Sequence, residues 1–300
     1  MPQRPDPPYS AHAVLSDPAR RAPALWRLVL GTVLTGALVM LLGQSLFAAT
    51  GALLSPAGFA DFEAAVLRAN TPAGLYALLF VVGGLGLGAM LAARGLHHRP
   101  ARSLFGARPL RLGLRCALFL IVLNGAVFLL PPWTLYDGIS ANLPAGLWLA
   151  LLPLSLLAVL IQTGAEELFF RGYLQSQLAA RFRHPLIWIG LPSALFALGH
   201  HAPDLFGPNA IWVTLWAFAF GVAMADLTAR TGSLGPAMAV HFVNNTGALL
   251  LVSMQGDMSG LALYTLPFTG ADTAAVRAYL PVDLAMIGLS WLTVRLALRV

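Results

Sequence analysis

The sequence predicts an all-α membrane protein, a polytopic bundle of about eight transmembrane helices. Hydrophobic residues make up 58% of the 300-residue chain and charged residues only 10%, against about 25% charged residues in ordinary soluble domains. The mean hydropathy is +0.76, and apolar runs recur at the length of about 20 residues that a helix needs to cross a bilayer. These runs lie near residues 26–49, 73–93, 114–131, 147–167, 185–200, 211–227, 235–254 and 281–298.

Arginine placement predicts how these helices are oriented. The chain has no lysine, and its arginines gather near the N-terminus, between the second and third runs, and after the fourth and sixth runs. Cytoplasmic loops carry such an excess of positive charge. We therefore expect a multi-pass protein of the inner (plasma) membrane with both termini in the cytoplasm. The same placement in short loops accounts for the net charge of +6 and argues against nucleic acid as a partner.

Two adjacent glutamates, Glu166 and Glu167, end the fourth apolar run. A carboxylate at membrane depth is expensive and is by default a candidate functional group. Arg171 lies four residues after Glu167 and so on the same helix face, whereas Glu166 points about 100° away. We expect Arg171 to hold Glu167 and to leave Glu166 free for acid–base chemistry. The alternative is a pair of charges that marks the membrane surface.

Histidines and an asparagine follow in later apolar runs. His200 ends the fifth run, and His241 and Asn245 lie four residues apart on one face of the seventh. At 1.5 Å per residue, Glu166 and His200 are both roughly 25 Å from the turn that joins their runs. His241 can join them if that hairpin projects into the cytoplasm, which puts the site a short way below the cytoplasmic surface. The alternatives are an interfacial role for His200, with which His201 competes, and a hydrogen bond between helices at His241 and Asn245.

Three motifs in order resemble the CAAX-protease and bacteriocin-processing family of intramembrane endopeptidases. They are Glu-Glu-Leu-x-Phe-Arg-Gly-x-Leu from Glu166, Phe-x-x-x-His ending at His200, and His-x-x-x-Asn from His241. The Arg-Thr-Gly-Ser-Leu-Gly-Pro stretch before His241 is also similar to the family. The resemblance covers about residues 145–255, and it implies proteolysis within the membrane.

The resemblance also implies a role for each site residue. Glu166 would be the general base that activates water, and His200 would help to hold that water. His241 and Asn245 would stabilise the oxyanion, while Glu167 and Arg171 would orient the helix. The family is also described as metalloproteases, in which case Glu166, His200 and His241 would bind zinc. Both mechanisms fit these residues; we favour the metal-independent one, with no cofactor required.

On this basis the chain divides into four segments. Residues 1–25 form a Pro- and Arg-rich cytoplasmic tail, expected to be mobile, and residues 26–144 hold the N-terminal transmembrane helices. Residues 145–255 form the catalytic core, and residues 256–300 hold a loop and the C-terminal transmembrane helix. The expected substrate is a peptide or a membrane-anchored protein met in the lipid bilayer. The alternatives are a transporter or proton relay that uses the Glu and His cluster, and an inactive bacteriocin-immunity scaffold.

Overall fold

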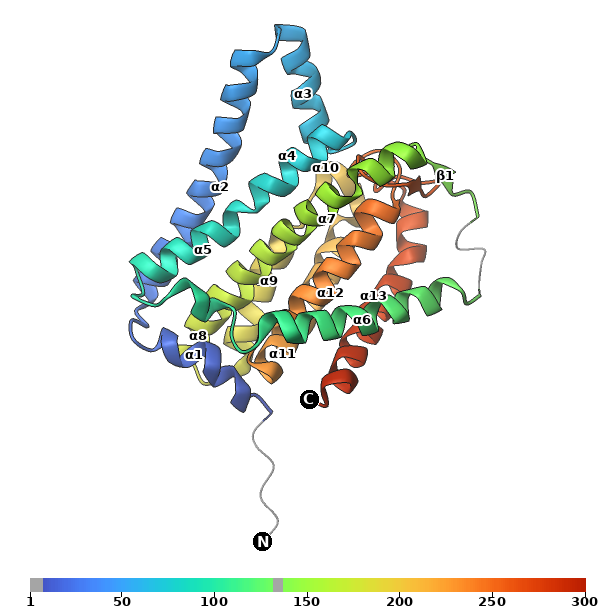
Figure 1. Cartoon of the computed structure of the whole chain (residues 1–300). Coiled ribbons are helices and arrows are strands. Elements are labelled where there is room, and N and C mark those ends of the chain that lie inside the picture. Colours follow the sequence, from blue (N-terminus) through green and yellow to red (C-terminus); the bar gives the residue numbers. More distant parts are fainter. Residues whose placement is uncertain (1–7, 132–136) are drawn as a thin grey trace.

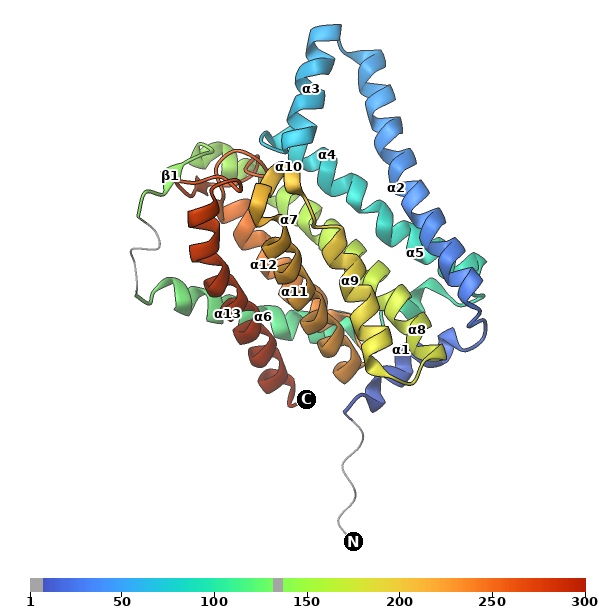
Figure 2. The same cartoon turned by 180° about the vertical axis from the view of Figure 1, so that it is seen from behind.

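The computed structural model describes residues 8–131 and 137–300, and these form an all-α bundle, as the composition predicts (Figures 1 and 2). Six described segments are long and apolar enough to cross a membrane: Leu25–Leu53, Pro72–Gly95, Pro109–Phe128, Ala145–Arg181, Pro203–Thr231 and Thr273–Leu298. The fifth and seventh predicted spans are shorter helical segments, over 186–198 and 235–251. The predicted number of eight is therefore approximate.

The N-terminal segment packs on the bundle. A 3-10 turn η1 (Ser10–His12) leads into α1 (Ala13–Ala19), and the side chains of His12, Leu15 and Ala19 are buried. The tyrosine hydroxyl of Tyr9 donates a 2.8 Å hydrogen bond to Asp226. The expectation of a mobile tail is thus wrong for residues 8–24, because this segment contributes apolar side chains that the bundle covers. Residues 1–7 of the predicted tail lie outside the described residues.

Two helices project from the bundle as a hairpin (Figure 1). They are α2 (Leu25–Leu53) and α3 (Pro56–Arg68). Sequence reasoning assigned residues 50–72 to a loop, but the Oγ of Ser55 accepts a hydrogen bond from the backbone N–H of Gly58 and Pro56 follows it at the first helical position. Both features favour a helix start, which explains α3.

The next three helices pack against the two helices that carry Glu166 and His241: the first two against the helix of Glu166 and the third against the helix of His241. The three are α4 (Pro72–Val82), α5 (Gly84–Gly95) and α6 (Pro109–Phe128). A Cβ atom at Gly86 would lie 3.0 Å from the Cα of Ala165. Glycine at this position therefore lets α5 approach the fourth predicted span directly beside Glu166.

The fourth predicted span is a long continuous helix. It consists of α7 (Ala145–Glu167), the π-helical η4 (Leu168–Gln175) and α8 (Ser176–Arg181). These 37 residues extend about 55 Å at 1.5 Å per residue, well beyond the roughly 30 Å hydrocarbon core of a bilayer. The π-helical segment begins immediately after the glutamate pair, and such segments often occur at functional sites.

The remaining elements surround α7. They are η5 (Leu186–Gly190), α9 (Leu191–Leu198), α10 (Pro203–Phe206), η6 (Gly207–Asn209), α11 (Ala210–Thr231), α12 (Gly235–Thr246), η7 (Gly247–Leu251) and α13 (Thr273–Leu298). A small sheet of order β1-β3-β2 joins β1 (Ser140–Ala141) antiparallel and β2 (Val252–Ser253) parallel to β3 (Tyr264–Thr265). Both described ends of the chain lie on the same side of the bundle as α1 and α8, away from this sheet (Figure 1).

Candidate active site

The centre of the site is an ion pair inside α7 and η4. Nη1 of Arg171 lies 2.8 Å from Oε1 of Glu167, and the two side chains are 1% and 0% exposed. This is the contact that the spacing of four residues predicts. Arg171 also donates a 3.2 Å hydrogen bond to the carbonyl of Gly221 on α11 and lies 4.8 Å above the ring of Phe196. The charges are therefore compensated within the protein interior.

His241 joins both glutamates. Its Nδ1 donates a 2.8 Å hydrogen bond to the same Oε1 of Glu167. Its Nε2 faces Oε2 of Glu166 at 3.4 Å. Glu167 therefore also fixes the ring orientation of His241, a role that sequence reasoning did not give it. The rings of Phe196 and Phe220 pack edge-on against the imidazole.

Glu166 differs from Glu167 in lining a cavity, although Oε2 of each glutamate is buried without a hydrogen bond to a described residue. The 3.4 Å separation of the Glu166 Oε2 from His241 satisfies an ion-pair distance but is long for a hydrogen bond. Buried polar atoms are normally hydrogen-bonded, so each exception needs an explanation. The cavity beside Glu166 supplies one.

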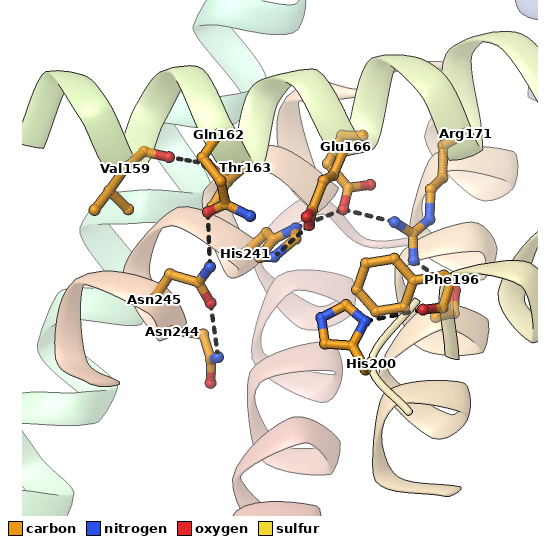
Figure 3. Close-up of polar contacts among 12 residues, drawn as sticks. Val159, Gln162, Thr163, Glu166, Arg171, Phe196, His200, His241, Asn244 and Asn245 are labelled. Atoms are coloured by element: carbon orange, nitrogen blue, oxygen red, sulfur yellow. Dashed lines mark hydrogen bonds and ion pairs between the residues drawn. The ribbon is translucent and has the colours of Figure 1, made fainter. Parts of the chain in front are cut away.

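A cavity of about 370 Å³ runs between α7, α9, α11 and α12, a size within the range of small-molecule and cofactor sites. Glu166, His200, His241 and Asn245 all line it. Figure 3 shows Gln162, Glu166, His241 and Asn245 in a row, with His200 below them. The structure thus brings together the four residues expected to do chemistry.

His200 follows the C-terminus of α9. Its Nδ1 donates a 2.9 Å hydrogen bond to the carbonyl of Phe196, which leaves Nε2 available to the cavity. The competing residue, His201, instead makes a 2.9 Å hydrogen bond through Nδ1 to Thr214 and is exposed. His201 is not among the residues that line the cavity. The geometry therefore favours His200 over His201.

The zinc ligands of the alternative mechanism are not assembled around one point in the described structure. Among residues 8–131 and 137–300, no group of three His, Cys, Asp or Glu side chains is arranged to hold a metal ion. Zinc requires ligand atoms about 2.0–2.2 Å from one centre. Nε2 of His241 lies 3.4 Å from Oε2 of Glu166, and Nδ1 of His241 bonds Glu167, a contact that zinc-bound histidines also commonly make. Because no third ligand completes a set among the described residues, we derive no step through zinc.

Comparisons with known proteins match the segment that holds this site. Residues 146–247 fit the model of a family described as type II CAAX prenyl endopeptidase Rce1-like. This segment is similar to that family, whose model does not extend over the rest of the chain. An uncharacterized protein of Bacillus subtilis (strain 168), YyaK, is 30% identical over 125 residues, which are 42% of this chain and 41% of the relative. The aligned part therefore spans about two fifths of that relative. No solved structure matches the chain.

The segment that fits this family model holds two cavity residues that sequence reasoning missed. Gln162 accepts a 3.0 Å hydrogen bond from Nδ2 of Asn245, and it lies one helical turn before Glu166 on the same face. That i, i+4 spacing to a glutamate in an apolar helix was a readable signal. Trp216 on α11 also lines the cavity, and its Nε1 has no hydrogen-bond partner in the described structure. Nothing in the sequence distinguishes Trp216 from other lipid-facing tryptophans.

Proposed function

We propose that the chain is an intramembrane endopeptidase of the CAAX-processing type, which hydrolyses a peptide bond with water activated by Glu166. One observation carries this proposal: the unsatisfied, buried Oε2 of Glu166 faces a cavity shared with His200 and His241. Oε2 of Glu167 also lacks a hydrogen bond, but Glu167 does not line this cavity, so of the two glutamates only Glu166 can meet a substrate or water there. The family match of the surrounding segment supports the same activity.

Each residue has a distinct task in the proposed reaction. Water lies between Glu166 and Nε2 of His200, and Glu166 takes its proton as the oxygen attacks the substrate carbonyl. The negative charge that develops on the carbonyl oxygen is stabilised by the second amide N–H of Asn245, and by Nε2–H of His241 when its ring carries protons on both nitrogens. When the C–N bond breaks, Glu166 returns the proton to the leaving amine. Glu167 and Arg171 position His241 and do not touch the substrate.

The amide–amide contact beside the site supports the task given to Asn245. Because Gln162 accepts one N–H of the Asn245 amide, the amide is fixed in orientation and its second N–H remains for the substrate. Preorganised donors of this kind lose little energy to reorganisation during reaction. The indole N–H of Trp216 offers a further donor to a peptide carbonyl outside the reacting centre.

The expected substrate is a peptide or a membrane-anchored protein. Apolar side chains of Leu78, Leu79, Val82 and Met258 line the cavity beside the polar row, so an apolar segment of a substrate would bury its side chains there. The placement of arginines puts cleavage near the cytoplasmic interface, with both termini of the enzyme in the cytoplasm. The identity of the membrane and this orientation are part of the proposal.

Quantitative proteomics of membranes tests the proposal. Membranes that contain wild-type protein are compared with membranes that contain Glu166→Gln, with Glu63→Gln as the matched control because Glu63 is exposed on α3. Fragments with new termini are expected in wild type and Glu63→Gln and not in Glu166→Gln. If no fragments separate wild type from Glu166→Gln, while wild type moves protons across liposomes, the relay alternative replaces the protease.

Metal dependence is tested on the same fragments. We expect purified protein treated with a strong chelator to keep most of its cleavage activity, because Glu166 acts directly on water. Stoichiometric zinc by elemental analysis, with activity that falls on zinc removal and returns on its addition, would contradict the metal-independent mechanism and leave the same residues in the site.

A further inference from the structure

A second cavity lies between the N-terminal segment and the turn from α8 to η5. It measures about 740 Å³ and is lined by His12, Ser16, Arg20, Arg181, Arg183 and Trp188, among others. It is on the side of the bundle where α1, α8 and the chain ends lie (Figure 1), and it shares no residue with the active-site cavity. No aspartate or glutamate lines it.

Two of the three arginines that line this cavity have free guanidinium groups in the described structure. Arg181 and Arg183 are exposed and make no ion pair or side-chain hydrogen bond with a described residue. Arg20 is partly engaged, through a 3.1 Å contact with Asp17 and a 3.3 Å hydrogen bond to the carbonyl of Ala180. The positive-inside rule explains why arginines occur here. It does not explain why three of them line one cavity, with Asp17 beside Arg20 as the carboxylate paired with them.

A buried imidazole adds a polar atom without a partner. His12 is only 4% exposed and lines the cavity, yet its Nε2 makes no hydrogen bond to a described residue. Its ring stacks on Trp188 at 4.9 Å, which fixes its orientation. Burial lowers the pKa of His12 to about 4, so the ring is neutral at pH 7 and offers hydrogen bonding without a second charge.

An apolar surface continues directly from this cavity. Pro185 and Trp188 line the cavity, while Leu186 and Leu191 of the same short helix are 75% and 48% exposed. In a membrane these leucines face lipid. A molecule with a charged head and apolar chains could therefore place its head among the arginines and its chains along η5 and α9.

We propose that this cavity binds the phosphate group of an anionic phospholipid of the cytoplasmic leaflet. Arginine is well suited to phosphate because its planar guanidinium group donates two parallel hydrogen bonds. Basic pockets at this level of membrane proteins recognise anionic head groups. Binding there fastens the N-terminal segment to the α8–η5 turn, since both form the cavity wall.

Thermal unfolding of the purified protein in neutral detergent tests the site. Short-chain phosphatidylglycerol, phosphatidylcholine and inorganic phosphate are titrated separately against wild type, Arg181→Gln/Arg183→Gln and a matched control, Arg94→Gln/Arg102→Gln. The control removes the same charge from exposed arginines that do not line the cavity. Arg183→Gln alone provides a milder variant if the double variant folds poorly.

We expect phosphatidylglycerol to raise the unfolding midpoint of wild type saturably, with an apparent Kd at least tenfold weaker in the cavity variant and within twofold of wild type in the control. Phosphatidylcholine should have little effect. Equal affinities of the cavity variant and the control, or equal effects of the two lipids, would overturn the proposal. Inorganic phosphate that binds as tightly as phosphatidylglycerol, with the same loss in the cavity variant, would overturn the lipid as the source of the phosphate.

Discussion

Two buried polar centres of the molecule contrast in how their charges are satisfied. In the Glu167 centre (Glu167, Arg171 and His241), a cation is held by a carboxylate 2.8 Å away. In the Arg99 centre (His97, Arg99 and Ser176), the guanidinium has only neutral partners. Arg99 donates to Oγ of Ser176 at 2.9 Å, to Oγ and the carbonyl of Ser103 at 2.9 and 3.2 Å, and to the carbonyl of Leu15 at 3.2 Å.

The second difference lies in what remains unsatisfied. Both ring nitrogens of His97 are used, Nδ1 by the carbonyl of Ala22 and Nε2 by the hydroxyl of Tyr173, each at 2.9 Å. In and beside the Glu167 centre, Oε2 of Glu167 and Oε2 of Glu166 have no hydrogen bond to a described residue, and of the two glutamates only Glu166 borders the active-site cavity. A saturated network holds elements together, whereas an unsaturated one next to a cavity is poised for a ligand. We therefore assign structure to the Arg99 centre and chemistry to the Glu166 side of the other.

Breaking the Glu167 centre should have the largest effect on stability. Glu167→Gln leaves the charge of Arg171 without a counter-charge in a buried setting, where loss of one partner costs about 3–5 kcal/mol. We expect a large drop in the unfolding midpoint measured in detergent. Glu63→Gln, on an exposed face of α3, should leave it unchanged. An unfolding midpoint in Glu167→Gln equal to that of wild type would show that the pair does not hold the helix.

Breaking the Arg99 centre should cost less, and the damage should be local. Arg99→Met leaves the buried carbonyl of Leu15 without its donor, and an unsatisfied buried group costs about 1–3 kcal/mol. We expect faster hydrogen exchange in α1, measured by mass spectrometry, with cleavage activity retained. Arg102→Met, which changes an exposed arginine three residues away, should leave exchange unaltered. Loss of cleavage with α1 still protected would contradict the structural assignment.

Low pH should lower the free energy of unfolding through two buried histidines of the same region, His12 and His97. Burial lowers the pKa of His12 to about 4 and lowers that of His97 as well. The unfolded chain therefore takes up these protons first, near the ordinary histidine value of about 6.5. The part of the free energy of unfolding that depends on these two histidines is therefore at its full value above that pH. It falls as the pH decreases, by up to about 1.4 kcal/mol per pH unit for each histidine.

A variant that removes the titrating group but keeps an aromatic ring against Trp188 tests this effect. His12→Phe should make the unfolding midpoint less sensitive between pH 7 and pH 4.5, while His98→Phe, at an exposed position, should leave the wild-type dependence. An unchanged pH dependence in His12→Phe would show that acid acts elsewhere.

Much of the Glu167 centre could be read from the sequence. A spacing of four residues in a helix dictates that Glu167 and Arg171 meet, and equal residue counts from a shared turn put Glu166 and His200 at one level. The hydrogen bond from His241 to Glu167 could not be read, since spacing within one helix does not tell which face meets another helix. The same limit hid the contact between Gln162 and Asn245.

The structure of the N-terminal region, in contrast, could not be predicted from the sequence. Its prolines and arginines suggested a mobile tail, but packing of His12, Leu15 and Ala19 against the bundle overrides that composition. From the sequence, Arg99 was one of the arginines expected in the cytoplasmic loop between the second and third apolar runs, and His97 had no assigned role. The buried side chains of Arg99 and His97 bond to the carbonyls of Leu15 and Ala22, about 80 residues earlier in the chain. A local sequence pattern cannot predict such distant contacts.

The central claim is that Glu166 carries the chemistry while Glu167 carries the structure. The most direct measurement is the cleavage rate of a substrate found in the membrane comparison, determined for wild type, Glu63→Gln and Glu166→Gln together with each unfolding midpoint. Because a general base contributes about 10²- to 10⁴-fold, the rate should fall by at least 100-fold in Glu166→Gln, with the midpoint unchanged, and Glu63→Gln should match wild type. A Glu166→Gln protein that cleaves at the wild-type rate would contradict the account.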